Sequence, residues 1–283
     1  MRTAYVVLGM HRSGTSSVAG TLALLGATAP RTLMRPADDN PRGFWESEVL
    51  MTVDDAILAA FGSRWDDWRP ISTEALAHVM EGELATRARA ALKSEFGDAD
   101  VIVLKDPRIC RFYSLWRVWL LAAGYRPMVI MPIRSPVEVA ASLQTRNGFA
   151  HNQALRLWLR HVLDAEQTSR QDARSIFDWS RLMANWRATI TSVDEVLGTD
   201  LASRIPAQGE GVDGFLTTDL RRQRAESLSR DSLSDWVDGT WNDLLALSMN
   251  PQDLAARTRL DQTRRAFNTA CSLFDDKASP DQP

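Results

Sequence analysis

The sequence predicts an α/β protein: a doubly wound, mostly parallel sheet flanked by helices, with a helical C-terminal extension. Three observations support this prediction. Short apolar runs alternate with longer segments in which apolar residues recur at helical spacing. The first run leads through a glycine loop into a helix, as at the start of a βαβ unit. Charged clusters follow the apolar runs at their carboxyl ends, where sheets of this kind bind ligands.

The expected elements follow from these patterns in order. Segment 30–47 holds three prolines and several turn residues, so it is expected to be a long irregular loop of the functional kind. Segment 199–231 reads as polar and irregular. Strands are expected at 4–8, 101–104, 127–133 and 173–177, and helices at 15–26, 48–61, 72–96, 111–123, 136–145, from 152 onward, 180–197 and within 234–274.

Bulk composition fits a globular chain with one local binding site. Of 283 residues, 45% are hydrophobic, and 33 Lys and Arg nearly balance 36 Asp and Glu, which does not favour a nucleic-acid binder. Cys110 and Cys271 lie far apart, which favours a reducing compartment. With no secretory pattern and no apolar run of roughly 18 residues, we expect a cytoplasmic protein. We expect a core at 1–198, a helical extension of the same domain at 199–275 and a disordered tail at 276–283.

The segment GMHRSGTS, from Gly9 to Ser16, is a candidate anion site. A glycine-hinged loop before a helix presents backbone N–H groups and the positive end of the helix dipole. Three hydroxyl side chains and Arg12 add further donors. An ordinary strand-to-helix turn can have the same glycine spacing. The loop also departs from ATP-binding P-loops, because Thr15 follows Gly14 where those loops carry lysine.

At this loop the chain resembles the sulfotransferases that use 3′-phosphoadenosine 5′-phosphosulfate (PAPS). In tyrosylprotein sulfotransferases and many bacterial carbohydrate sulfotransferases the phosphosulfate loop has the form P-R-S-G-T-[ST], and here histidine replaces the proline. The resemblance implies a P-loop-like fold. It also implies that six residues of the loop bind PAPS: His11, Arg12, Ser13, Gly14, Thr15 and Ser16.

Three further segments extend the resemblance. In PIRSPVEVAAS, Arg134 ends a strand and Ser142 lies in the next helix, like the family's 3′-phosphate site, and a guanidinium fork suits a phosphate. In LKDPR, Lys105 takes the place of the lysine that faces the transferring sulfonate. IFDWSRL resembles the family's Y-E-D-L segment, which implies a place near adenine for Phe177; plain core is equally compatible.

An acceptor hydroxyl also needs a base. In cytosolic sulfotransferases a histidine follows two residues after the strand-end lysine, but Pro107 stands there in this chain. Tyrosylprotein and several glycan sulfotransferases use a glutamate after the loop and its helix, which favours Glu46 in GFWES, where aromatic neighbours can raise its pKa. Asp106 is the alternative base, although a strand-end aspartate often only caps the following turn. Arg12 and Lys105 are expected to neutralise the charge that moves to the leaving group.

We therefore expect a PAPS-dependent sulfotransferase that moves sulfonate to a hydroxyl of a carbohydrate, glycolipid or small molecule, without a metal. The alternatives are a P-loop small-molecule kinase that uses ATP and Mg²⁺, or a non-catalytic nucleotide-binding module. The site at Arg134 and Ser142 best distinguishes a sulfotransferase from a kinase, because PAPS has a 3′-phosphate and ATP has none. Trp65 and Trp68 fit a sugar platform or, more often, core packing, and His151 and His161 are expected on helix surfaces.

Overall fold

The computed structural model describes residues 1–217 and 233–275, and the expected tail at 276–283 lies outside these residues. Within the described chain, four parallel strands form one sheet in the order β2-β1-β3-β4. All four expected strands are confirmed, within two residues at their ends. They are β1 (Arg2–Val7), β2 (Val101–Lys105), β3 (Tyr125–Ile133) and β4 (Ala173–Asp178).

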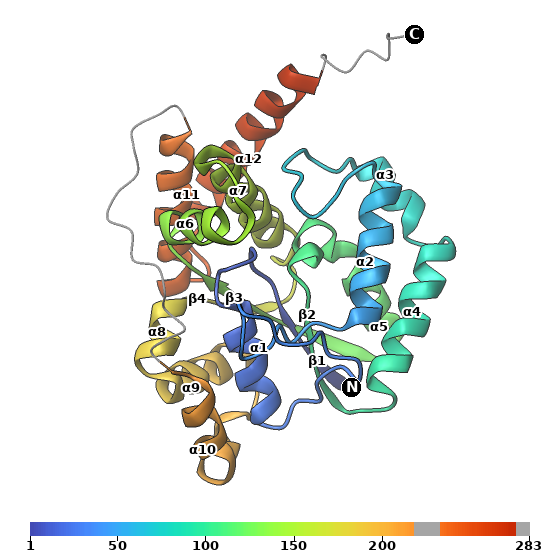
Figure 1. Ribbon diagram of the computed structural model, residues 1–283, viewed down its shortest axis with the longest axis vertical. Helices are drawn as coiled ribbons and strands as arrows, with labels where there is room; N and C mark the ends of the chain where they lie inside the picture. Colours follow the sequence, from blue (N-terminus) through green and yellow to red (C-terminus); the bar gives the residue numbers. More distant parts are fainter. Residues whose placement is uncertain (218–232, 276–283) are drawn as a thin grey trace.

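Helices cover both faces of this sheet (Figure 1). Side chains alternate along β1, so that Tyr5 and Val7 pack against α1, α9 and α10, while Ala4 and Val6 pack on the other face among α2, α4, α5 and α7. The predicted doubly wound α/β fold is therefore confirmed. The helices are α1 (Thr15–Leu24), α2 (Glu48–Ala60), α3 (Thr73–Val79), α4 (Glu83–Phe96), α5 (Tyr113–Ala122), α6 (Pro136–Asn147), α7 (His151–Thr168), α8 (Trp179–Ala184), α9 (Trp186–Leu197), α10 (Ile205–Phe215), α11 (Ser234–Met249) and α12 (Leu254–Asp275), with 3-10 turns η1 (Pro107–Arg111) and η2 (Ala202–Arg204).

The parallel register brings the four strand tips to one edge of the sheet. Val7 at the end of β1 pairs with Lys105 of β2, and Ile133 at the end of β3 pairs with Asp178 of β4. The glycine loop follows β1 at this edge, and Arg134 follows β3 directly. This is the edge at which ligands bind in open parallel sheets.

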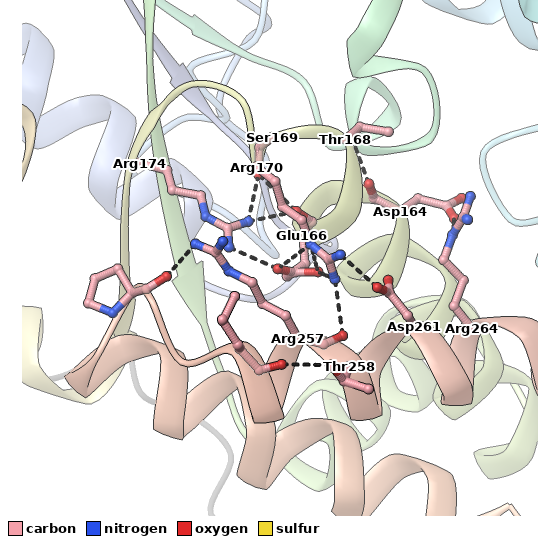
Figure 2. A network of polar contacts seen from close by, with 12 residues as sticks. Asp164, Glu166, Thr168, Ser169, Arg170, Arg174, Arg257, Thr258, Asp261 and Arg264 are labelled. Atoms are coloured by element: carbon pink, nitrogen blue, oxygen red, sulfur yellow. Dashed lines mark hydrogen bonds and ion pairs between the residues drawn. The ribbon is translucent and has the colours of Figure 1, made fainter.

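The C-terminal helices pack against α7 and β4. A buried ionic network joins these elements (Figure 2). The carboxylate of Glu166 on α7 accepts hydrogen bonds from Arg170 (2.6 Å) and from Arg174 of β4 (2.8 Å). Arg170 also donates to Asp261 of α12 at 2.8 Å. We call these four residues the Glu166 cluster; it links α12 to the edge of the sheet through α7.

Two of the expected helices are each divided in two. Segment 72–96 forms α3 and α4, separated at Met80–Gly82, with Gly82 as the N-cap of α4. Segment 180–197 belongs to α8 and α9, because the Asn185 side chain accepts from the Ala188 amide and starts a new helix. Gly82 and Asn185 favour helix ends, and each lies inside a segment whose apolar residues recur at helical spacing.

Two other expectations are wrong. Residues 205–215, expected to be irregular, form α10 despite three glycines, because Phe215 packs against the open face of Gly20 on α1. Tertiary packing overrides the low helix propensity of this segment. His161, expected on a helix surface, is fully buried. Trp65 and Trp68 are half-buried against the core.

Candidate functional site

A cavity opens to solvent at the carboxyl edge of the sheet, and the space in it, open solvent included, is about 730 Å³. Its charged lining consists of four cationic side chains and two carboxylates, an excess of two positive charges. We call these six residues the cavity cluster: Arg12, Lys105, Arg134, Arg146, Asp39 and Glu46. The remaining lining residues are His11, Gly14, Thr15, Ser16, Ser17, Asn40, Pro41, Phe44, Pro107, Ser142 and Trp179.

The glycine loop forms one wall of this cavity. Arg12 and Gly14 both have positive φ, 70° and 80°, so the chain turns twice before α1 begins. Within the described residues no side chain caps α1, and its first N–H groups are left for a ligand. Gly14 is required here, because an added Cβ would lie 2.0 Å from the Trp179 ring.

Arg12 and Arg134 meet at the tips of neighbouring strands. The Arg12 Nε donates to Ser142 Oγ at 2.8 Å, and its Nη1 donates to Asp39 Oδ2 at 3.1 Å. The Arg134 Nη1 donates to the Arg12 carbonyl at 3.0 Å. The Arg134 guanidinium lies over the Trp179 ring, 4.6 Å from its centroid. The loop cation and the strand-end cation thus border one cavity.

Lys105 and Glu46 form a buried ion pair on the opposite side of the loop. The Lys105 ammonium donates to the Glu46 carboxylate, to the Phe44 carbonyl at 3.0 Å and to Ser16 Oγ at 3.3 Å. Trp45 has positive φ (59°), a strained conformation directly before Glu46. Burial raises the pKa of the Glu46 carboxyl, with Lys105 opposing the shift and Asp106 adding to it.

Asp106 and Arg108 lie behind this pair. Asp106 is 2% exposed, caps η1 through the Arg108 amide and binds the Arg108 guanidinium at 3.1 Å. Arg108 also pairs with Asp55 at 2.6 Å and lies 3.8 Å from Glu46. Asp106 does not line the cavity, so its contacts are those of a cap and a buried counter-ion.

The structure brings most of the residues named from the sequence to this cavity. Of the twelve, nine line it: His11, Arg12, Gly14, Thr15, Ser16, Glu46, Lys105, Arg134 and Ser142. Ser13, Asp106 and Phe177 do not. The Ser13 side chain is buried and without a hydrogen-bond partner in the described chain. Phe177 lies in the apolar cluster on the α1 face, and Trp179 borders the cavity instead.

Sequence reasoning missed eight lining residues, among them Asp39, Asn40, Arg146 and Trp179. Asp39 and Asn40 belong to the loop 30–47, which was expected to be functional but whose tip could not be placed over Arg12 without the fold. Arg146 lies in the last turn of α6. Trp179 follows the tip of β4, so the rule that ligands bind at strand ends could have pointed to it.

The described residues contain neither a metal-binding group nor a membrane-spanning helix. No three His, Cys, Asp or Glu side chains among them are grouped so that they could hold a metal ion. No helix in the described part of the chain is long and apolar enough to cross a membrane.

Comparison with known proteins gave a structural neighbour. No protein-family model matches the sequence, and no curated protein matches it. Among solved structures, the chain is similar to the sulfotransferase domain of the olefin synthase from Synechococcus PCC 7002, with 14% identity over 85% of this chain and 94% of that domain, and a TM-score of 0.45.

Proposed function

We propose that this chain is a PAPS-dependent sulfotransferase that moves sulfonate to a hydroxyl group of a carbohydrate, glycolipid or small molecule. One observation carries the proposal. Arg12 and Arg134 border the same positively charged cavity at neighbouring strand tips, and Ser142, which accepts from Arg12, lines it too. A donor with a 5′-phosphosulfate and a 3′-phosphate needs two such cationic places close together.

The cavity residues fit this donor. The uncapped first turn of α1 and the αL glycine form a cradle for the phosphosulfate. Arg134 and Ser142 supply guanidinium and hydroxyl donors for the 3′-phosphate. The buried Nε1 of Trp179 has no hydrogen-bond partner in the described chain and adds a donor at the same wall. When bound, PAPS supplies an activated sulfonate on an excellent leaving group.

The chain's own residues position and neutralise charge. Lys105 is held by the Phe44 carbonyl and Ser16 beside the first turn of α1, where its ammonium can stabilise negative charge on the sulfonate oxygens. Arg12 donates to Ser142 Oγ at the cavity wall, so its guanidinium can neutralise the leaving phosphate. Both cations are fixed in place before the reaction, which is what lowers the barrier.

Glu46 is the proposed base for the acceptor hydroxyl. It lines the cavity, whereas Asp106 does not, and that difference favours Glu46 over Asp106. The raised pKa makes its carboxylate a better proton acceptor than an exposed glutamate. Its partner Lys105 keeps the carboxylate ionised and oriented. The cytoplasmic location, expected from the isolated cysteines, is part of the same proposal.

Thermal stabilisation by nucleotides tests the proposal. The product 3′-phosphoadenosine 5′-phosphate (PAP) at 100 times its dissociation constant should stabilise the protein by about 2.7 kcal/mol. ADP and ATP, with or without Mg²⁺, should stabilise it much less, because they lack the 3′-phosphate. Equal protection by ATP with Mg²⁺ would support a kinase and contradict the proposal.

A further inference from the structure

Two buried histidines face each other beside the cavity. His11 belongs to the glycine loop and His161 to α7, and they are 8% and 0% exposed. Their ring centroids lie 6.3 Å apart with the planes at 71°. Trp65 packs edge-on against His11 at 5.0 Å, so aromatic contacts hold the His11 ring on more than one side.

The protonation of His161 follows from its surroundings. Its Nδ1 lies 2.8 Å from the Leu157 carbonyl, which can only accept, so Nδ1 carries the hydrogen. Burial lowers the pKa of His161 to about 3, with Arg111 adding to the shift, so the ring is neutral. Its Nε2 therefore presents a lone pair.

The Nε2 atoms of both histidines are buried and have no hydrogen-bond partner among the described residues. A buried polar atom without a partner costs about 1–3 kcal/mol. If His11 carries its hydrogen on Nε2, one hydrogen bond toward His161 satisfies both atoms, by a small approach of the rings or through one water. With the hydrogen on Nδ1 instead, both Nε2 atoms would be buried lone pairs without a donor.

The other nitrogen of His11 is then an acceptor. His11 lines the cavity, and its Nδ1 is not sealed in the interior as Nε2 is. Burial lowers the pKa of His11 well below its ordinary value; Arg108, His161, Arg146 and Lys105, the groups that face it, all add to this effect. The ring therefore stays neutral beside the cavity.

We propose that His161 fixes His11 in the Nε2–H form, so that Nδ1 of His11 faces the cavity as a hydrogen-bond acceptor for a hydroxyl of the acceptor substrate other than the one that Glu46 deprotonates. A nitrogen lone pair accepts from a hydroxyl and repels an oxyanion. His11 thus belongs to the acceptor side of the site, although it lies in the loop that cradles the donor. His161 is a positioning residue. The assignment of His11 to binding of the acceptor substrate rests on the proposed function.

Nitrogen-15 NMR of the full-length protein tests the tautomers directly. Long-range couplings should show His11 protonated at Nε2 only and His161 at Nδ1 only, with neither ring charged at neutral pH. In His161→Phe, His11 should shift toward the Nδ1–H form. His11 found in the Nδ1–H form in the wild-type protein, or doubly protonated, would overturn the inference even if His161→Phe fails to fold.

Binding of PAP, measured by calorimetry, tests which side His11 serves. His11→Leu should bind PAP within about twofold of wild type, as should the exposed-histidine control His78→Asn, whereas Arg12→Ala should lose at least tenfold. A tenfold loss in His11→Leu would place His11 on the donor and overturn the assignment. If wild-type protein does not bind PAP, the proposed function fails, while the NMR result still decides the tautomers.

Discussion

Two of the ionic clusters in the described part of the chain differ in how their charges are balanced. In the Glu166 cluster, the carboxylate of Glu166 accepts from Arg170 and Arg174, and Asp261 accepts from Arg170. None of these four residues lines the cavity. In the cavity cluster, four cations and two carboxylates share one open space and leave two positive charges in excess.

This difference teaches what marks a binding site. Both clusters contain buried arginines with short contacts to carboxylates, so burial and ion pairing do not separate them. What separates them is whether the charges are balanced within the protein or face a cavity with an excess of one sign. The Glu166 cluster joins α7, β4 and α12, whereas the cavity cluster leaves an excess of positive charge facing an open space, as the proposed anion site requires.

The largest effect is expected at Glu46. Glu46→Gln should lower turnover of PAPS-dependent sulfonation by about 10²–10⁴-fold, because the acceptor proton loses its base. PAP binding should stay near wild type, while the melting temperature should fall, because the buried Lys105 loses its counter-ion. Because the Glu46 pKa is raised and its ionised form is the active one, wild-type activity should fall as the pH drops through this raised value.

Steady-state rates with labelled donor measure this effect. Glu48→Gln, which changes an exposed glutamate two residues away, is the matched control and should be silent. Unchanged turnover in Glu46→Gln would move the base to Asp106.

In the Glu166 cluster, substitution should lower stability and leave turnover unchanged. Glu166→Ala leaves Arg174 without its carboxylate and Arg170 with Asp261 alone, at a cost of about 3–5 kcal/mol in the free energy of unfolding. Urea denaturation measures this loss, and turnover per folded molecule should not change. Asp261→Asn removes a carboxylate that is 34% exposed and should cost about 1 kcal/mol or less. Loss of turnover in folded Glu166→Ala would show that the Glu166 cluster also supports the reaction, and the proposed difference between the two clusters would be wrong.

The sequence predicted the strands and the cavity residues better than the helix ends. β1 to β4 are short, buried and β-rich, so their pattern has one interpretation, and their parallel order places Lys105 and Arg134 at one edge. The motif resemblance supplied nine of the lining residues, and most of these nine follow the tips of β1, β2 and β3.

The remaining features depend on tertiary contacts. His161 lies on a helix whose face was expected to meet solvent, and only the packing of α7 shows that it meets His11. α10 exists because Phe215 fills the space over Gly20. Asp39 reaches Arg12 from a loop that no periodic pattern positions.

Arg134 should control the choice of nucleotide. Arg134→Ala should weaken PAP binding by about 10–100-fold, because a charge-assisted contact to the 3′-phosphate is lost, and ADP binding should change much less. Calorimetry with both nucleotides measures the ratio. Arg126→Ala removes an exposed arginine at the other end of β3 and is the control. An equal loss for PAP and ADP would mean that Arg134 supports the loop through the Arg12 carbonyl and does not read the 3′-phosphate.

The smallest effect is expected at Asp39, the carboxylate that pairs with Arg12 at 3.1 Å and lies 3.9 Å from Arg146. Its side chain is 34% exposed, so the pair is worth about 1 kcal/mol or less. A phosphate must compete with this carboxylate for the same cations. Asp39→Asn should therefore tighten PAP binding by about two- to fivefold, whereas Asp38→Asn, with the same change in charge, should not. Weaker binding in Asp39→Asn would show that Asp39 holds Arg12 in its binding position, and the cavity cluster would then resemble the Glu166 cluster more closely than its excess charge indicates.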